Sequence, residues 1–296
     1  MGCLNSGQGF SHWFSNIHLS GACNRSCYFC IGQHMMALDP FDNLSKKDLD
    51  GFDEFISKCK EHNIGDVNLT GSNTDPLLYQ HHEYLIGKLR ELIPGVRVGL
   101  RTNGALALKR KDIVKLYDKM SVSVTTLNPE LYVKTMGQGT PPDLKQILQI
   151  NPEMDVKINV VLCPESIESD IYDTLKNFQE IGIKRVNIRE PYGQPHIGNP
   201  FLNPTARAKE LGIEYLKETL GMQTYSLNDM EITYWDVHYV EVESVNLYAN
   251  GVVSVDYPVT RGHDPIYGDV RDQSKYEKSG RVREQWLFTK KKLKVV

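Results

Sequence analysis

The sequence predicts an α/β fold built on a parallel sheet. Short segments rich in Val, Ile, Leu or Thr recur about 25 to 35 residues apart, which is the length of a βα unit. Between them lie segments whose apolar residues repeat at helical spacing. Repeated β-α order implies parallel strands joined by right-handed crossovers, in an open sheet or in a full or partial barrel. In either arrangement, ligands bind at the carboxyl ends of the strands.

The first two-thirds of the chain contains the predicted parallel strands. Their ranges are 14–21, 66–71, 97–104, 121–126, 155–162 and 185–190. A helix is expected over 44–64, with Ser45 and Asp48 as its N-cap pair and Cys59 on its buried stripe. A second helix is expected over 169–185, with Gly182 at its C-terminal end.

The pattern changes near residue 200. A loop over 193–204 is followed by an expected helix over 205–221 and by a hairpin over 242–259, whose turn contains Asn250-Gly251. The sequence therefore predicts two parts, an α/β part over 1–200 and a small antiparallel C-terminal unit over 201–296.

Composition narrows the class of protein. The net charge of -3 provides no overall basic field, which disfavours a dedicated nucleic-acid binder. The one basic run, 289–296, is typical of a solvated tail. No stretch approaches the 18 or so apolar residues of a membrane helix and no export leader is visible, so we expect a cytoplasmic protein without a membrane span. The opening MGCLNS fits an N-myristoylation acceptor at Gly2, with Ser6 in place and Cys3 available for a second acyl chain, which would matter only in a eukaryotic host.

The stretch CNRSCYFC holds three of the six cysteines, Cys23, Cys27 and Cys30. In a reducing compartment such a cluster points to metal or redox chemistry. A structural zinc site needs four ligands, and no second cysteine pair is present. Three histidines could complete a Cys3His site: His12, His18 and His34. The alternative is a [4Fe-4S] cluster held by three cysteines, with one iron left open for a substrate or cofactor.

The spacing C-x3-C-x2-C, in the loop after the first strand and with Phe29 just before the last cysteine, resembles the motif of the radical SAM superfamily. The resemblance implies a partial (β/α)6 TIM-like barrel. It also implies a [4Fe-4S] cluster on the three cysteines and S-adenosylmethionine (SAM) bound at the open iron. Reductive cleavage of SAM gives a 5′-deoxyadenosyl radical, which abstracts a hydrogen atom from the substrate.

Within this resemblance, a small polar or nucleotide-like biosynthetic substrate is favoured. Peptide or protein modification, and a non-catalytic zinc or iron-sulfur protein, stay open as alternatives. An external electron donor such as flavodoxin or ferredoxin is expected as a partner.

Further segments extend the resemblance over residues 15 to 192. LTGSNTDPLLY resembles the turn that receives the amino group of SAM, and LRTNG resembles the third strand of enzymes related to the molybdenum-cofactor protein MoaA. The strands after it resemble the remaining barrel strands of those enzymes. The implied cofactor contacts are Phe29, Thr70, Gly71, Asn73, Asp75, Asn103, Ser123, Asn159 and Arg189.

The C-terminal unit resembles the SPASM or twitch extension of many radical SAM enzymes. No cysteine follows Cys163, so we expect a cap without an auxiliary cluster. Candidate substrate contacts there are Tyr248, Asp256, Arg261 and His263. Cys163, at the end of the fifth strand, is the candidate catalytic residue, since a thiol there could return a hydrogen atom to a substrate radical.

Overall fold

The fold was analysed in a computed structural model. It describes residues 13–32, 42–165, 171–191, 198–201, 206–219, 221–235, 243–255, 263–264 and 268–269. The N-terminal acylation pattern, the basic run at 289–296, His12 and His34 lie outside them.

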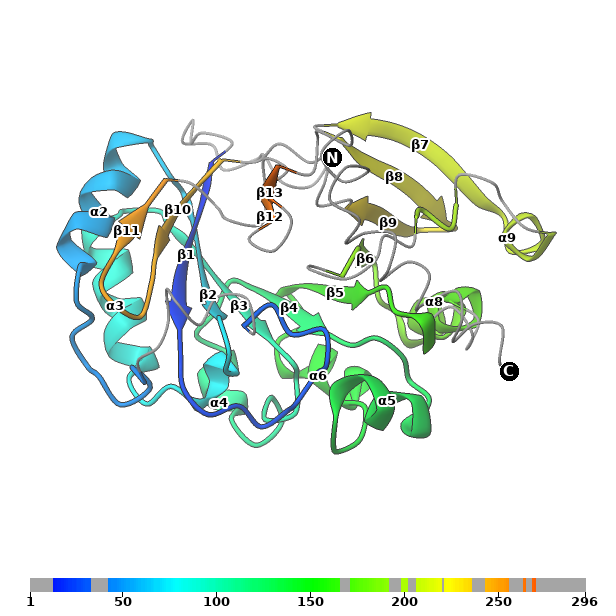
Figure 1. Ribbon diagram of the computed structural model, residues 1–296, viewed down its shortest axis with the longest axis horizontal. Helices are drawn as coiled ribbons and strands as arrows, with labels where there is room; N and C mark the ends of the chain where they lie inside the picture. The colour runs from blue at the N-terminus through cyan, green and yellow to red at the C-terminus, as the bar shows by residue number, and fades with distance from the viewer. Residues whose placement is uncertain are drawn as a thin grey trace.

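In the part of the chain that the structure describes, a curved sheet of eleven strands forms the centre (Figure 1). Six parallel strands at its middle confirm the predicted α/β class and the partial barrel. They are β1 (Phe14–Leu19), β2 (Asp66–Gly71), β3 (Arg97–Thr102), β4 (Lys119–Ser123), β5 (Asp155–Val161) and β6 (Arg185–Arg189). Each overlaps a range that the sequence predicts, although β4 begins two residues before its predicted range, and they lie side by side in chain order.

The strands after residue 200 join the same sheet at both of its edges. The order is β11-β10-β1-β2-β3-β4-β5-β6-β9-β8-β7. β9 pairs parallel with β6 and β10 pairs parallel with β1, while β7, β8 and β11 pair antiparallel with their neighbours. Their bounds are β7 (Ile213–Thr219), β8 (Met222–Leu227), β9 (Met230–Trp235), β10 (Ser244–Leu247) and β11 (Val253–Ser254). Antiparallel strands are thus present as expected, whereas the division of the chain near residue 200 stays a prediction.

The predicted hairpin is formed by β10 and β11. Asn250 Oδ1 accepts a hydrogen bond from Val252 N at 3.0 Å, and Gly251 has φ +83°. The turn packs on the start of helix α2, where a Cβ at Gly51 would lie 2.1 Å from the Gly251 carbonyl oxygen. A separate two-stranded sheet joins β12 (His263–Asp264) to β13 (Gly268–Asp269).

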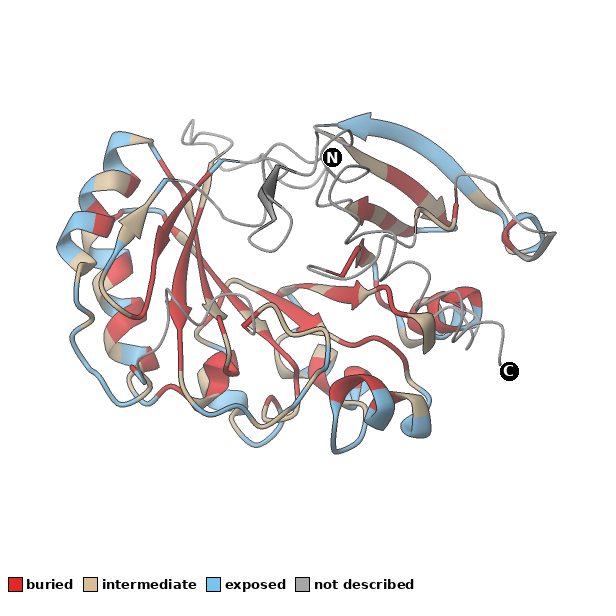
Figure 2. Ribbon diagram, in the orientation of Figure 1, coloured by how far each residue is buried: buried red, intermediate tan, exposed pale blue. Residues whose placement is uncertain are grey.

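Helices cover the outer side of the curved sheet (Figure 1). They are α2 (Phe52–Glu61), α3 (His82–Leu92), α4 (Lys111–Val114), α5 (Pro129–Met136), α6 (Leu144–Ile150), α8 (Ile171–Ile181) and α9 (Ala206–Glu210), with a short 3-10 helix η1 (Pro76–Leu78). Their apolar stripes and the outward side chains of the strands form one core, which Figure 2 shows as the buried layer. Cys59 and Phe178 are fully buried in it, as their helical spacing predicts.

Two helix predictions are wrong. α2 begins at Phe52 after Gly51, whose φ is +75°, and no side chain caps it, so Ser45 and Asp48 are not its N-cap pair. The helix expected over 205–221 ends at Glu210, and β7 follows. Gly212 takes a left-handed φ of +74°, which interrupts the helix, and pairing of β7 with β8 then outweighs local helix propensity.

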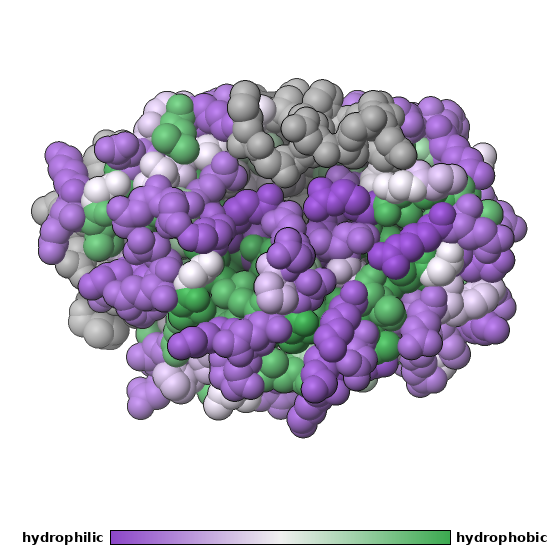
Figure 3. All heavy atoms as spheres, turned by 180° about the vertical axis from the view of Figure 1, so that it is seen from behind, coloured by the Kyte–Doolittle hydropathy of each residue, from purple (hydrophilic) through white to green (hydrophobic). Residues whose placement is uncertain are grey.

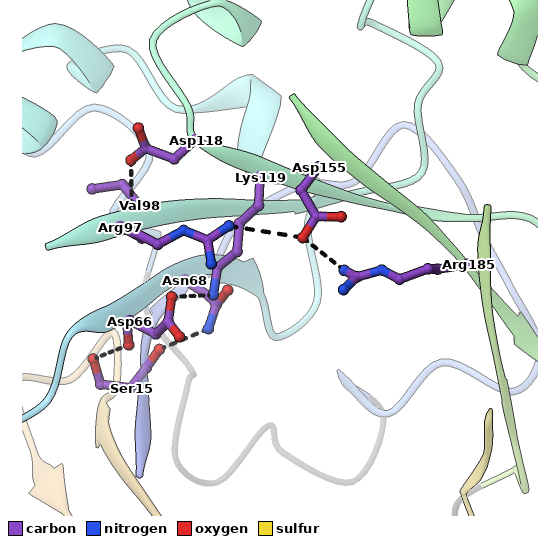
Figure 4. Close-up of polar contacts among 9 residues, drawn as sticks. All are labelled: Ser15, Asp66, Asn68, Arg97, Val98, Asp118, Lys119, Asp155 and Arg185. Carbon is purple, nitrogen blue, oxygen red and sulfur yellow. Dashed lines mark hydrogen bonds and ion pairs between the residues drawn. The ribbon is translucent and has the colours of Figure 1, made fainter. Parts of the chain in front are cut away.

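The inner face of the sheet is polar, because residues alternate between the two faces of a strand. At the amino-terminal ends of the strands, ion pairs reach across this face (Figure 4). Lys119 lies 2.6 Å from Asp66, and Asp155 lies 2.8 Å from Arg185. The Lys119 side chain passes over β3 at Gly99, where a Cβ would lie 2.8 Å from Lys119 Cε. Glycine at this position therefore lets charges from β2 and β4 meet.

Hydrophilic residues cover most of the surface seen from behind, with apolar residues gathered between them near the middle of the view (Figure 3). In the part of the chain that the structure describes, no helix has the length and apolar character needed to cross a membrane.

Candidate active site

The three clustered cysteines lie in the loop that follows β1, at the carboxyl ends of the strands. The loop is fixed to the segment after β4: Ser26 N donates to the Met136 carbonyl at 3.1 Å. Gly137, with φ +82°, permits this approach, since a Cβ there would lie 2.1 Å from Ser26 Oγ. Within the loop, Cys30 N donates to the Cys27 carbonyl at 3.1 Å. These backbone contacts set the positions from which the thiols project.

The three cysteines are thiols rather than disulfides, and they lie close enough to influence one another. Cys23 is exposed and Cys27 and Cys30 are partly buried. Burial, followed by the charges of Cys30 and Cys23, raises the pKa of Cys27 to about 12. Thiolates so close together repel, and iron cations that bind them offset this repulsion while displacing their protons. Three mutually interacting thiols therefore fit the protein ligands of a [4Fe-4S] cluster.

The geometry does not favour the zinc alternative. His18, the described histidine of the proposed Cys3His set, lies buried between other partners: its Nε2 is 3.3 Å from Asn246 Oδ1 and its Nδ1 is 3.3 Å from Ser72 Oγ.

Side chains from the turns after β2 and β3 and from α5 hold the cysteine loop in place. Asn103 Nδ2 donates to Asn24 Oδ1 at 2.7 Å, and Thr74 Oγ1 donates to the Ala22 carbonyl at 2.7 Å. Arg25 Nε donates to the Tyr132 hydroxyl at 3.2 Å. Asn103, predicted as a cofactor contact, is thus placed at the loop and orients it.

Asp75 lies buried in the turn after β2. Its carboxylate accepts hydrogen bonds from Leu77 N at 2.9 Å, from Thr102 Oγ1 at 2.8 and 2.9 Å, and from Asn103 N at 2.6 Å. Burial raises the pKa of this carboxyl, and the hydrogen bonds oppose the rise. The sequence predicts that Asp75 accepts the ammonium of a cofactor, and that role stays a prediction, since the structure gives both oxygens partners within the protein.

Two other residues of this turn also shape the backbone. A Cβ at Gly71 would lie 1.7 Å from the Thr74 carbonyl oxygen, so the tight turn requires glycine. Asn73 Oδ1 accepts hydrogen bonds from Ser20 Oγ at 2.8 Å and from Gly21 N at 3.0 Å. Gly71 thus permits the tight turn, and Asn73 joins the turn to the start of the cysteine loop.

The remaining predicted contacts face the barrel interior near the carboxyl ends of the strands. Strand register places Ser123 beside Asn159 on β4 and β5, and Thr70 and Arg189 occupy inward positions on β2 and β6. Asn159 is 7% exposed, and its Oδ1 has no hydrogen-bond partner among the described residues. Leaving a buried acceptor without a partner costs free energy. Asn159 is therefore placed to receive a donor from a bound molecule.

Cys163 lies next to the cysteine loop. It is buried, 1% exposed, just after β5. The hydroxyl of Tyr28, which precedes Phe29 in the loop, donates to Glu165 Oε2 at 2.7 Å. Burial, and then the charges of Cys163 and Glu165, raise the pKa of Tyr28. The structure thus brings the predicted catalytic thiol beside Tyr28, whose ring meets that of Phe29 edge-on at 5.4 Å.

Of the predicted C-terminal contacts, Tyr248 is described. It is buried, with its ring stacked on His18 at 4.7 Å. Asp256 and Arg261 lie outside the described residues, and for His263 the structure describes the backbone alone.

Comparison with known proteins decides the family. The family model of the Radical SAM superfamily matches residues 17–189, which is more than half of the chain. The chain belongs to the radical SAM superfamily. It is therefore a radical SAM enzyme, with a [4Fe-4S] cluster and SAM as its cofactors.

The relatives of this radical SAM enzyme are distant. GTP 3′,8-cyclase from Staphylococcus aureus (strain JH9) is 27% identical over 183 residues, which cover 58% of this chain and 52% of the relative. The chain thus spans about half the length of the curated relatives it matches. The crystal structure of Streptococcus suis SuiB bound to SAM matches with a TM-score of 0.54 at 14% identity, over 83% of this chain and 61% of that one. The structure of SuiB alone matches with a TM-score of 0.52 at 13% identity over the same shares. Both similarities support the fold.

Sequence reasoning missed two groups near this radical SAM site. The first is Tyr28 with Glu165, whose pairing joins residues 137 positions apart. The second is Lys157, which faces inward between strands that carry arginines. Alternation along β5 could have placed Lys157 on the face of Asn159.

Proposed function

We propose that this radical SAM enzyme abstracts a hydrogen atom from a small polar or nucleotide-like biosynthetic substrate inside the barrel. When bound, the cluster and SAM supply the 5′-deoxyadenosyl radical that carries out the abstraction. The observation that supports the proposal is the position of the three interacting thiols, in one loop at the carboxyl ends of parallel strands whose inner face is polar.

Different residues would ligate the cluster and position its ligands. Cys23, Cys27 and Cys30 are the proposed cluster ligands. Thr74 and Asn103 hold their loop through hydrogen bonds of 2.7 Å to Ala22 and Asn24. This fixes the ligands before the cluster binds, which limits the ordering cost.

Inward polar groups at the carboxyl ends of the strands are the proposed binding surface for SAM. They are Thr70, Ser123 and Asn159. The buried Asn159 Oδ1 supports this assignment, because a donor from the cofactor would satisfy it. Cys163, which interacts with Tyr28 of the cysteine loop, is the proposed hydrogen-atom donor to a substrate radical.

Anaerobic reconstitution with iron and sulfide, followed by dithionite and SAM, tests the proposal. We expect 5′-deoxyadenosine and methionine from the wild-type enzyme and neither from Cys27→Ala, which removes one of three ligands. Cys59→Ala is the matched control, because Cys59 lies buried in the core away from the loop. One bound zinc per chain with no 5′-deoxyadenosine would disprove the proposal. Replacing dithionite with reduced flavodoxin or ferredoxin tests the proposed electron donors.

A further inference from the structure

Three cations face the barrel interior above the row of ion pairs. Strand register places Arg101, Ser121 and Lys157 next to one another on β3, β4 and β5. Arg189 lies farther along β6 on the same face. The side chain between the two cations, that of Ser121, is short. The three cations therefore surround one part of the interior.

The nearby carboxylates are already used by other cations. Asp66 pairs with Lys119 at 2.6 Å, and Asp155 pairs with Arg185 at 2.8 Å and with Arg97 at 3.8 Å. Farther along the inner face of β2 to β6, the residues that the structure describes are neutral or cationic. They are Asn68, Thr70, Arg101, Ser121, Ser123, Lys157, Asn159, Val161, Asn187 and Arg189. Among these described strand residues, the side chains that carry a charge are all cationic.

Lys157 is the cation of this group whose charged form is most destabilised by its surroundings. Among the described residues, its Nζ makes no hydrogen bond or ion pair. Burial is the main cause that lowers the pKa of Lys157 to about 7, and the charges of Arg189, Arg101, Arg185 and Lys119 lower it further. A buried charge without a counter-ion is costly, and a bound anion would offset that cost.

Aromatic rings hold the two arginines on the inner face. The Arg101 guanidinium carbon lies 5.6 Å from the centre of the Phe14 ring, and that of Arg189 lies 4.8 Å from the centre of the Trp235 ring. A guanidinium placed on a ring keeps a fixed plane, and its N–H groups suit phosphate or carboxylate oxygens. Recognition of an anion here would need little reorganisation.

We propose that Arg101, Lys157 and Arg189 bind an anionic group of the substrate that carries at least two negative charges, as a phosphate chain or as neighbouring carboxylates. The assignment of this group to the substrate rests on the proposed function. The binding site itself rests on the arrangement of the three side chains. An anion site here narrows the proposed substrate class from polar molecules in general to anionic molecules. It also disfavours a peptide substrate that lacks an anionic group of this kind.

Isothermal titration calorimetry on the reconstituted enzyme with saturating SAM tests the proposal. Inorganic pyrophosphate and citrate are the two probes, one for each chemical source of charge. We expect one of them to bind at a single site, and Lys157→Gln to weaken that binding about tenfold or more, since it removes a charge-assisted contact. Lys145→Gln on α6, an exposed residue, changes the net charge equally and should leave the affinity unchanged.

Lys157→Arg keeps the charge and should restore most of the affinity, which guards against a Gln variant that folds poorly. Failure of both probes to bind, equal losses in the Lys157 and Lys145 variants, or competition between the probe and SAM would each overturn the proposal. Competition would assign the cations to the carboxylate of SAM. Anion binding without 5′-deoxyadenosine formation would instead reject the proposed function and keep the anion site, so the two failures are distinguishable.

Discussion

Asp75→Asn separates two roles for a buried carboxylate. The structure has Asp75 joining the turn after β2 to the turn after β3, through Leu77 N, Thr102 Oγ1 and Asn103 N. The asparagine side chain has the same shape, so its oxygen can keep the hydrogen bonds made by one carboxylate oxygen. Its NH2 group replaces the other carboxylate oxygen and then faces hydrogen-bond donors.

The expected cost follows from the bonds that are lost. A hydrogen bond to a charged acceptor contributes about 1.5–3 kcal/mol. The bond from Asn103 N, at 2.6 Å, is one that the amide cannot keep together with those at Oδ1. Burial raises the pKa of Asp75, which shows that the charged carboxylate also carries a desolvation cost. The neutral amide avoids this cost, which offsets part of the stability lost with the hydrogen bonds. We expect the free energy of unfolding to fall by about 2 kcal/mol.

Urea unfolding of the cluster-free protein, followed by circular dichroism, measures this change as a shift in midpoint at constant slope. Asp143→Asn is the matched control: Asp143 caps α6 at the surface, where asparagine is an equally good N-cap, so its effect should be small. The reasoning is refuted if Asp75→Asn unfolds like the wild type and assembles the cluster, yet loses affinity for SAM. That result would favour the direct cofactor contact that the sequence predicts.

Three further changes test other parts of the structure. Gly99→Ala should destabilise the fold by about 1–3 kcal/mol in urea unfolding, because the new Cβ would lie 2.3 Å from Asn68 Oδ1. Gly87 is the control: it is an exposed helical residue where a Cβ would meet nothing within 4 Å, so Gly87→Ala should stabilise the fold. Relative to Lys157→Gln, the wild type should gain unfolding free energy as pH rises from 7 to 9, by at most about 2–3 kcal/mol. The reason is that Lys157 loses its proton from about pH 7 in the folded state but near pH 10.5 in the unfolded state. A stability difference between the two proteins that does not change with pH would contradict the burial of this charge. Tyr28→Phe removes the hydrogen bond to Glu165 at a partly exposed site. The iron content should therefore stay unchanged, and the free energy of unfolding should fall by less than about 1 kcal/mol. Loss of iron would instead show that the Tyr28–Glu165 hydrogen bond holds the cysteine loop.

The sequence allowed a correct prediction of those features that depend on local pattern. The six parallel strands and α8 follow from apolar periodicity, and Gly182 ends α8 with φ +100° as predicted. The cysteine spacing was sufficient to suggest the family to which the chain belongs.

Features that depend on distant pairing were not predicted. Asp75 is engaged by Thr102, 27 residues later, and nothing near Asp75 in the sequence shows this contact. The segment at 213–219 forms a strand because β8 pairs with it, although its composition suits a helix. Alternation places Lys157 on the inner face, but its proximity to Arg101 and Arg189 depends on register across four strands.

The position of β10 has a consequence for biosynthesis. β1 hydrogen-bonds to β2 on one side and to β10 on the other, and Asn16 on β1 contacts Asn246, 230 residues away. While the ribosome is still translating the second half of the message, one edge of β1 has no native neighbour and is a template for aggregation. Chaperone protection of the nascent chain, and delivery of iron and sulfide only after its release, would suit a protein whose first strand is completed last.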